Sequence, residues 1–414
     1  MSDERVLLLG NTGVEKETAI NKLKQYRENI KSKGSLQYVS FESNLDTDLL
    51  PYLDSNEDAQ RRHWLRAWDR TAQELKDIEA EIVILGMHGV LTRSIYGSRS
   101  PAIVRRIVED FRPTKIISLI QDVYIHQYRT SRRAGEKDYK GKPDSVQLLE
   151  ARRSSIFLGD LINNQSSAQG IPINHYTISA WHPAQVLNSV LSDYSHSSVY
   201  LAFPITEPRE RLREGDGTLK NTLNEKFQKI YNYSFQRDTE VFFFTPLTID
   251  EYPYSELLKS LDICTDEEQN VTFDMNERWS IRDFIEYKEP LLTEESSIPS
   301  NITLEVSGRE SASTPGLISA DVRYRDYKLV RQSDYVGVVN PIFPGMTEIS
   351  GGVDNEIQHA FRNATPVHIY QDDELDENGI IEDKFSNGGS LGLGDLSRMV
   401  VVYNDLRRWL ESFE

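Results

Sequence analysis

A glycine-containing loop near the start of the chain has the composition of a phosphate-binding site. Gly10-Asn11-Thr12-Gly13-Val14-Glu15-Lys16-Glu17-Thr18 follows an apolar run and opens a segment of helical pattern. Backbone N–H groups at such a strand-to-helix junction can hold phosphate. The pattern GxxxxGK[ST] is broken, because Glu15 stands where glycine is needed and Glu17 where a magnesium-binding hydroxyl is needed. Thr18 offers a hydroxyl one position late, about 100° further around a helix. Gly10, Gly13, Lys16 and Thr18 are therefore candidate nucleotide-binding residues, with ATP and magnesium as their candidate ligands.

A second cluster of small and acidic residues lies late in the chain. Ser350-Gly351-Gly352 precedes Glu356 near the start of a predicted helix, where backbone N–H groups could bind a phosphate. Breaking an N-glycosidic bond generates positive charge on the sugar, and a carboxylate beneath the ring can stabilise it or form a covalent intermediate. A second acidic group then handles the proton of the leaving base. Without such partners, Glu356 would be an ordinary acid that favours a helix start.

The elements that must position these residues follow an α/β rhythm. With 414 residues, the chain exceeds what one hydrophobic core usually serves, so two domains are expected. Short apolar runs alternate with helical stretches, which predicts a mostly parallel sheet flanked by helices in each domain. The expected strands are 6–9, 80–85, 115–120, 198–204, 240–245, 335–339 and 366–370, and the expected helices are 17–33, 100–111, 183–191, 218–235, a helix ending at 327–332, and 353–362.

We place the domains at residues 1–193 and 194–414. The polar run 192–198 is typical of a linker. Residues 262–300 hold 11 acidic and 3 basic side chains. They indicate a largely solvated insert in the second domain, over about 262–316, with helical pieces around 279–287.

Composition restricts the function classes. The net charge of −18 disfavours extended contact with nucleic acid. The one cysteine, Cys264, excludes a disulfide framework or a cysteine-based zinc site, and none of the 8 histidines is paired at helical ligand spacing, so no metal site is expected. We read His359 and His368 as structural. No run of about 20 apolar residues and no secretory signal is present, which predicts a cytoplasmic protein without a membrane partner.

Residues 1 to 192 resemble, in patches, the adenylate kinase family, especially its archaeal-type members. The resemblance rests on the loop above, on the strand and turn AEIVILGMHGVLTR (80–93), on KIISLI (115–120) followed by Arg129, Arg132 and Arg133, and on the helical stretch around Arg152 and Arg153. It implies a P-loop fold in which these arginines clamp nucleotide phosphates. A scaffold kept only for packing, nucleotide binding without transfer, and a competent kinase all stay open.

Residues 198–370 resemble the nucleoside 2-deoxyribosyltransferase superfamily, closest to the 2′-deoxynucleoside 5′-phosphate N-hydrolases. Four pieces occur in the expected order: Tyr200-Leu201-Ala202, Arg325-Asp326, the run 331–336 (RQSDYV) and the run 350–357 (SGGVDNEI). The resemblance implies a flavodoxin-like sheet, Glu356 as the nucleophile, Tyr200 orienting it and Asp326 assisting at the base or sugar.

The same resemblance supplies the substrate contacts. Ser350 matches the serine that holds the 5′-phosphate, with Gly351 and Gly352 beside it. Asp334 is kept as a substrate-binding candidate, although its place before a strand also fits a structural role. The stretch 340–349 is longer than the family's usual connection and could reshape the pocket. Members of the superfamily usually complete their sites by self-association, which implies a homo-oligomer.

Three hypotheses follow. The first is a nucleotide N-glycosidase or deoxyribosyltransferase acting on a small nucleotide, with a P-loop-like module and no cofactor needed for the glycosidase chemistry. The second is a nucleoside monophosphate kinase regulated by its C-terminal domain. The third is a non-catalytic nucleotide sensor. Pairing a nucleotide sensor with a nucleotide-degrading domain would suit defence against phage.

Overall fold

The computed structural model describes residues 4–11, 13–45, 55–93, 97–99, 104–136, 143–192, 196–215, 217–234, 241–264, 267–279, 291–292, 298–340, 349–371 and 399–414. The chain divides into two compact units. Unit 1 comprises Met1–Leu191, Ile249–Arg278 and Glu289–Val322, and unit 2 comprises Ser192–Thr248, Trp279–Lys288 and Arg323–Glu414. The polypeptide therefore passes between the units several times, whereas the sequence suggested a single boundary near residue 193.

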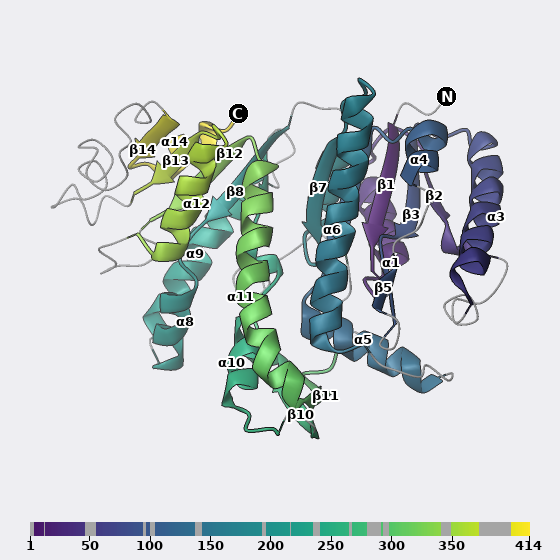
Figure 1. Cartoon of the computed structure of the whole chain (residues 1–414). Helices are drawn as coiled ribbons and strands as arrows, with labels where there is room; N and C mark the ends of the chain where they lie inside the picture. The colour runs from purple at the N-terminus through teal and green to yellow at the C-terminus, as the bar shows by residue number, and fades with distance from the viewer. Residues whose placement is uncertain are drawn as a thin grey trace. The chain divides into compact units, whose positions relative to one another are not determined.

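Unit 1 is built on a five-stranded parallel sheet (Figure 1). Its order is β2 (Leu36–Ser40), β3 (Ile82–His88), β1 (Glu4–Gly10), β6 (Lys115–Ile120) and β7 (Asn174–Ser179). Successive residues of β1 face opposite sides of the sheet, and nearly all of them are buried. This is expected for an apolar strand in a parallel sheet that is covered on both faces. The connecting elements are α1 (Lys16–Asn29), η1 (Glu42–Asn44), α3 (Glu57–Lys76), α4 (Val104–Arg106), η2 (Ile107–Phe111), α5 (Val123–Glu136), α6 (Ser145–Ala168), α7 (Ala184–Leu191) and the hairpin of β4 (Leu91–Arg93) and β5 (Gly97–Arg99).

The helices of unit 1 bury the apolar faces of that sheet. Leu7 and Leu85 share one cluster with Trp68 of α3, Phe111 of η2 and Ile162 of α6. Helices α1 and α7 pack against each other. The carboxyl ends of β1 and β6 are neighbours, which places the loop after Gly10 beside the start of α5.

The segment expected to be a solvated insert is instead part of unit 1. After α10 (Tyr252–Ser260), it forms an antiparallel pair of β10 (Glu268–Asp274) and β11 (Asn301–Ser307), η4 (Met275–Glu277) and the first part of α11 (Gly308–Arg331). One face of the β10–β11 pair is buried through Val271, Phe273 and Leu304, with the Phe273 ring 4.8 Å from that of Tyr124. Most described residues between 262 and 300 are exposed, as expected, but the segment belongs largely to unit 1 and not to the second domain. The helical pieces expected at 279–287 lie outside the described residues, apart from residue 279.

Unit 2 carries the second five-stranded parallel sheet (Figure 1). Its order is β14 (Val400–Tyr403), β13 (Val367–Tyr370), β12 (Tyr335–Val339), β8 (Ser197–Ala202) and β9 (Val241–Phe244). Its helices are α8 (Thr206–Arg213), α9 (Gly217–Ser234), η3 (Pro246–Thr248), the end of α11, α12 (Gly351–Arg362) and α14 (Leu406–Glu411). The two parallel sheets flanked by helices confirm the predicted α/β class.

Gly337 lets α14 pack closely on the unit 2 sheet. A Cβ at this position of β12 would lie 2.8 Å from the Trp409 ring. The indole N–H of Trp409 donates to the His368 carbonyl at 2.9 Å, so α14 is fixed across β12 and β13.

Candidate functional site

Three side chains from three separate elements of unit 2 form a carboxyl cluster. Tyr200 lies in the middle of β8, Asp326 near the end of α11 and Glu356 on the second turn of α12. The Tyr200 hydroxyl donates a hydrogen bond of 2.7 Å to Glu356 Oε1. Asp326 lies near enough for its charge to act on both Tyr200 and Glu356. The structure thus brings together the three residues predicted to be catalytic.

The electrostatics of this cluster are strongly perturbed. Burial and the charge of Asp326 raise the pKa of Glu356 well above its usual range, and the Tyr200 hydrogen bond and Arg325 only partly oppose them. Burial, with the charges of Asp326 and Glu356, also raises the pKa of Tyr200, which keeps its hydroxyl proton available for donation. Perturbed groups of this kind concentrate at functional sites, although structural networks produce them as well.

The start of α12 lies next to Glu356. Ser350 is the N-cap residue, with its hydroxyl accepting from the Val353 amide at 3.4 Å. Gly351 and Gly352 are exposed, and a Cβ added at Gly351 would meet no atom within 4 Å. The first amides of a 12-residue helix thus lie beside open space one turn from the carboxyl cluster. Of the stretch 340–349, residues 341–348 lie outside the described residues.

Asp334 is not part of this cluster. Its carboxylate accepts from the Ser198 amide at 2.9 Å and from the Ser198 hydroxyl at 2.7 Å. Both residues lie at the amino ends of β12 and β8, so Asp334 joins the starts of two neighbouring strands. This geometry supports the structural reading of Asp334.

The two histidines near Glu356 in sequence make packing contacts. The His359 ring stacks on Tyr327 with centroids 4.2 Å apart, and burial lowers its pKa. His368 is buried and its Nδ1 lies 2.7 Å from the Ser412 hydroxyl. Both observations agree with structural roles.

In unit 1 the charged side chains of the glycine-containing loop contact other groups of the protein. Glu15, the N-cap of α1, has φ 50° and ψ 49°, a left-handed conformation that favours glycine. Its carboxylate forms an ion pair of 3.2 Å with Arg129, while Lys16 Nζ lies 3.3 Å from the Gly10 carbonyl. Gly13 has φ +96°, and a Cβ there would lie 2.9 Å from His126.

The charged and hydroxyl side chains of this loop do not fit a magnesium nucleotide. Glu15 places a carboxylate in the loop and Glu17 is exposed, whereas Thr18 is half-buried one residue further along α1. Arg132 donates to the Tyr128 hydroxyl on its own helix, and the side chain of Arg133 lies outside the described part of the chain. Among the described residues, no group of three His, Cys, Asp or Glu side chains could hold a metal ion.

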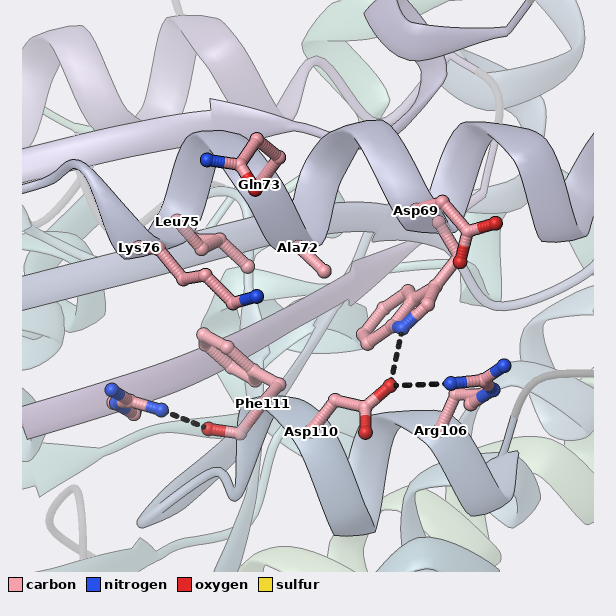
Figure 2. A pocket seen from close by; sticks show the side chains of 10 residues that line it. Asp69, Ala72, Gln73, Leu75, Lys76, Arg106, Asp110 and Phe111 are labelled. Carbon is pink, nitrogen blue, oxygen red and sulfur yellow. Dashed lines mark hydrogen bonds and ion pairs between the residues drawn. The ribbon is translucent and has the colours of Figure 1, made fainter.

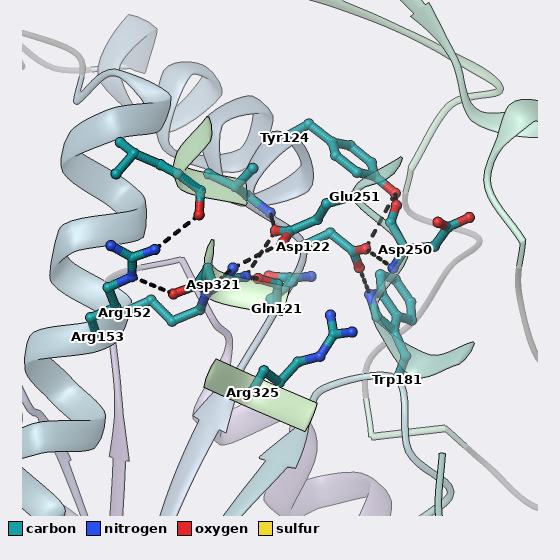
Figure 3. Close-up of polar contacts among 12 residues, drawn as sticks. Gln121, Asp122, Tyr124, Arg152, Arg153, Trp181, Asp250, Glu251, Asp321 and Arg325 are labelled. Carbon is teal, nitrogen blue, oxygen red and sulfur yellow. Dashed lines mark hydrogen bonds and ion pairs between the residues drawn. The ribbon is translucent and has the colours of Figure 1, made fainter. Parts of the chain in front are cut away.

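The arginines of α6 bind carboxylates of unit 1 rather than open space (Figure 3). Arg152 donates to both oxygens of Glu251, at 2.8 and 2.9 Å, and also to Asp321. Arg153 donates to Asp321 at 2.6 Å. Burial alone would lower the pKa of Arg152, but the charges of Asp321 and Glu251 outweigh it and raise that pKa. We call Arg152, Arg153, Glu251 and Asp321 the arginine lock.

Two helix N-termini in unit 1 are also occupied by carboxylates. Glu251 Oε1 accepts from the Val123 amide at the start of α5, at 2.7 Å. Glu310 Oε1 accepts from the amide and hydroxyl of Ser145 at the start of α6, and Glu310 Oε2 accepts from Ser307, which caps α11. Positions that suit an anion are thus filled by the chain itself.

A cavity of about 440 Å³ lies elsewhere in unit 1 (Figure 2). Trp68, Leu75 and Phe111 form its apolar wall, and Trp68 Nε1 and Arg106 both donate to Asp110, at 2.9 and 3.2 Å. None of the residues predicted from the sequence lines it.

No protein-family profile matches the chain, and no curated protein sequence matches it. The arrangement of its side chains is therefore the basis for any functional conclusion. In the described residues, no helix is both long enough and apolar enough to cross a membrane.

Sequence reasoning missed several residues that shape these sites. Arg325 was noticed only as the neighbour of Asp326, yet its guanidinium contacts that carboxylate at 2.9 Å. Glu251 and Asp321 gave no local signal, because their partner Arg152 is 99 and 169 residues away. The spacing Ser307-x-x-Glu310 is a capping-box signature that would have located the start of α11.

Proposed function

We propose that unit 2 is a nucleotide N-glycosidase that releases the base from a nucleotide or deoxynucleotide, with Glu356 as nucleophile. The observation that carries the proposal is the 2.7 Å hydrogen bond from Tyr200 to Glu356, beside Asp326, in a single compact unit. A retaining glycosidic cleavage uses one carboxylate as nucleophile and a second carboxyl group as acid and base, and here a phenol holds the first of the two.

Each group has a defined task in this reaction. Tyr200 orients Glu356 for attack on C1′ of the sugar. Asp326 delivers a proton to the departing base and then receives one from the water that hydrolyses the intermediate. The Ser350 hydroxyl and the amides of Gly351 and Gly352 bind the 5′-phosphate at the start of α12. A nucleoside without phosphate would lose these contacts and react more slowly.

The experiment is incubation of the pure protein with deoxynucleoside monophosphates, nucleoside monophosphates, deoxynucleoside triphosphates and NAD, followed by chromatography. We expect free base from at least one of them and none from Glu356→Ala. Glu225→Gln, which removes a charge from an exposed glutamate of α9, is the matched control and should react at the wild-type rate. Base release that survives Glu356→Ala in a folded protein would remove the proposal, as would no base from any nucleotide.

A further inference from the structure

The arginine beside the carboxyl cluster, Arg325, contacts one of its two carboxyl groups directly. Arg325 contacts Asp326 Oδ1 through two nitrogens, Nε at 3.0 Å and Nη2 at 2.9 Å. Both residues are buried, with 5% and 9% of their surfaces exposed. Within the described residues, Glu356 has no lysine or arginine within ion-pair distance, and its polar contact is the neutral Tyr200 hydroxyl. The cation is therefore paired directly with Asp326, whereas its charge acts on Glu356 without such a contact.

Among the described residues, the titratable groups that shift the pKa of Glu356 come from two neighbouring elements. Strand β8 contributes Tyr200, and α11 contributes Arg325 and Asp326. On α12 itself, His359 lies one turn further along, and its lowered pKa leaves it neutral near pH 7. Two carboxyl groups whose charges act on each other in a buried site do not both ionise readily.

We propose that Arg325 is a positioning residue that keeps the negative charge on Asp326, so that the empty site holds one proton and that proton resides on Glu356. The guanidinium contact stabilises ionised Asp326, and the hydroxyl contact tolerates a protonated Glu356. The resemblance noted above implies only a nucleophile and an assisting acid, and it assigns no role to Arg325.

The catalytic consequence rests on the proposed function. Before attack, Glu356 passes its proton to Asp326. As the Glu356 carboxylate forms the ester bond to C1′, the C1′–N bond breaks, its electron pair leaves with the base, and Asp326 gives the base nitrogen its proton. Asp326 then takes a proton from water, the hydroxide adds to C1′, and Glu356 leaves as carboxylate. Return of that proton to Glu356 restores the starting state, so the cycle consumes one water and conserves the shared proton.

The test is a titration of the full-length protein without substrate, by NMR of ¹³C-carboxyl-labelled glutamate and aspartate. Glu356→Gln and Asp326→Asn identify the two signals. We expect the midpoint of Glu356 to lie above the ordinary value of about 4.3. Asp326→Asn should lower that midpoint by about one pH unit or more, because the neighbouring negative charge is gone. Arg325→Met should raise the midpoint of Asp326 by a similar amount, and Arg325→Lys should largely restore it.

An ordinary midpoint for Glu356 in the wild type, or no shift of that midpoint in Asp326→Asn, would overturn the inference. If Arg325→Met does not fold, Arg325→Lys and Asp326→Asn carry the same test. Because no substrate is present, the titration is independent of base release. The expected midpoints without any base release would reject the proposed glycosidase and keep the proton assignment, whereas base release with ordinary midpoints would do the reverse.

Discussion

The Tyr200 hydroxyl lies 2.7 Å from Glu356, a residue 156 positions further along the chain. Tyr200 is fully buried in a strand, so its ring is held by the sheet and its hydroxyl is aimed by it. Replacing Tyr200 by Phe keeps the ring and removes only the donor. We expect the fold to survive and the rate of base release to fall by about 10- to 100-fold.

Tyr200→Phe should also shift the pH dependence of base release in a defined direction. The Tyr200 hydrogen bond lowers the pKa of Glu356, so Tyr200→Phe should raise that pKa further. The basic limb of the pH–rate profile should then move to higher pH, because the proton that Glu356 passes to Asp326 before attack is lost only at higher pH. A profile that stays in place while the rate falls would show that Tyr200 acts only by orientation.

The arginine lock predicts a large loss of stability when its cation is removed. Arg152→Met removes the buried cation that Glu251 and Asp321 share, and we expect unfolding to become easier by about 3–5 kcal/mol in denaturant titration. Adding Glu251→Gln and Asp321→Asn should recover part of that loss. Arg407→Met, which breaks an exposed pair with Glu411, is the control and should leave the free energy of unfolding nearly unchanged. Equal losses for Arg152 and Arg407 would contradict a structural role for the lock.

Replacing Glu15 by glycine tests whether this side chain limits nucleotide binding to the loop of unit 1. Glu15→Gly removes a carboxylate from the loop, releases its ion pair with Arg129 and suits the left-handed backbone. We expect binding of magnesium-ATP, measured by calorimetry, to strengthen by at least about tenfold. Glu28→Gln makes the same charge change at an exposed position of α1 and should leave binding unaltered. Identical affinities in the two variants would mean that Glu15 does not limit binding.

The Glu42–His88 pair should make the free energy of unfolding depend on pH in the acidic range. Its carboxylate pairs with His88 at 2.7 Å, and although burial opposes ionisation, His88 and Lys16 lower its pKa from 4.5 to about 2. The stabilisation is therefore complete above about pH 4.5 and is lost as the pH falls toward 2. We expect wild type to lose about 3 kcal/mol more than Glu42→Gln over that range, as measured by denaturant unfolding at each pH. Parallel curves for the two proteins would rule this out.

Local pattern located seven of the ten strands described in the two parallel sheets, but it missed β2, β7 and β14 and was insufficient for the segment 249–322. The runs 115–120 and 335–339 match β6 and β12 residue for residue, because continuous apolar stretches are typical of buried parallel strands. Helix α11 extends from Gly308, but Pro315 inside it and the small residues around it resemble a loop. Its buried Glu310 and Asp321 stabilise the helix through partners that are distant in sequence.

For a related reason, the sequence predicted the carboxyl cluster but not the partners of the arginines in unit 1. Tyr200, Asp326 and Glu356 were found through the order of short pieces, and the contact between Tyr200 and Glu356 followed. Arg152 and Arg153 were expected to face phosphate, but their partners are side chains that no spacing rule links to them. Charge complementarity between distant segments leaves no periodic signal, so it becomes visible only in three dimensions.

The interleaving of the two units determines how the protein can be dissected. A fragment ending at residue 192 would keep Arg152 and the starts of α5 and α6, yet it would lack Glu251, Glu310 and Asp321. Separate expression of an N-terminal half should thus yield an insoluble product, and cutting between the units near residue 322 would sever a continuous helix.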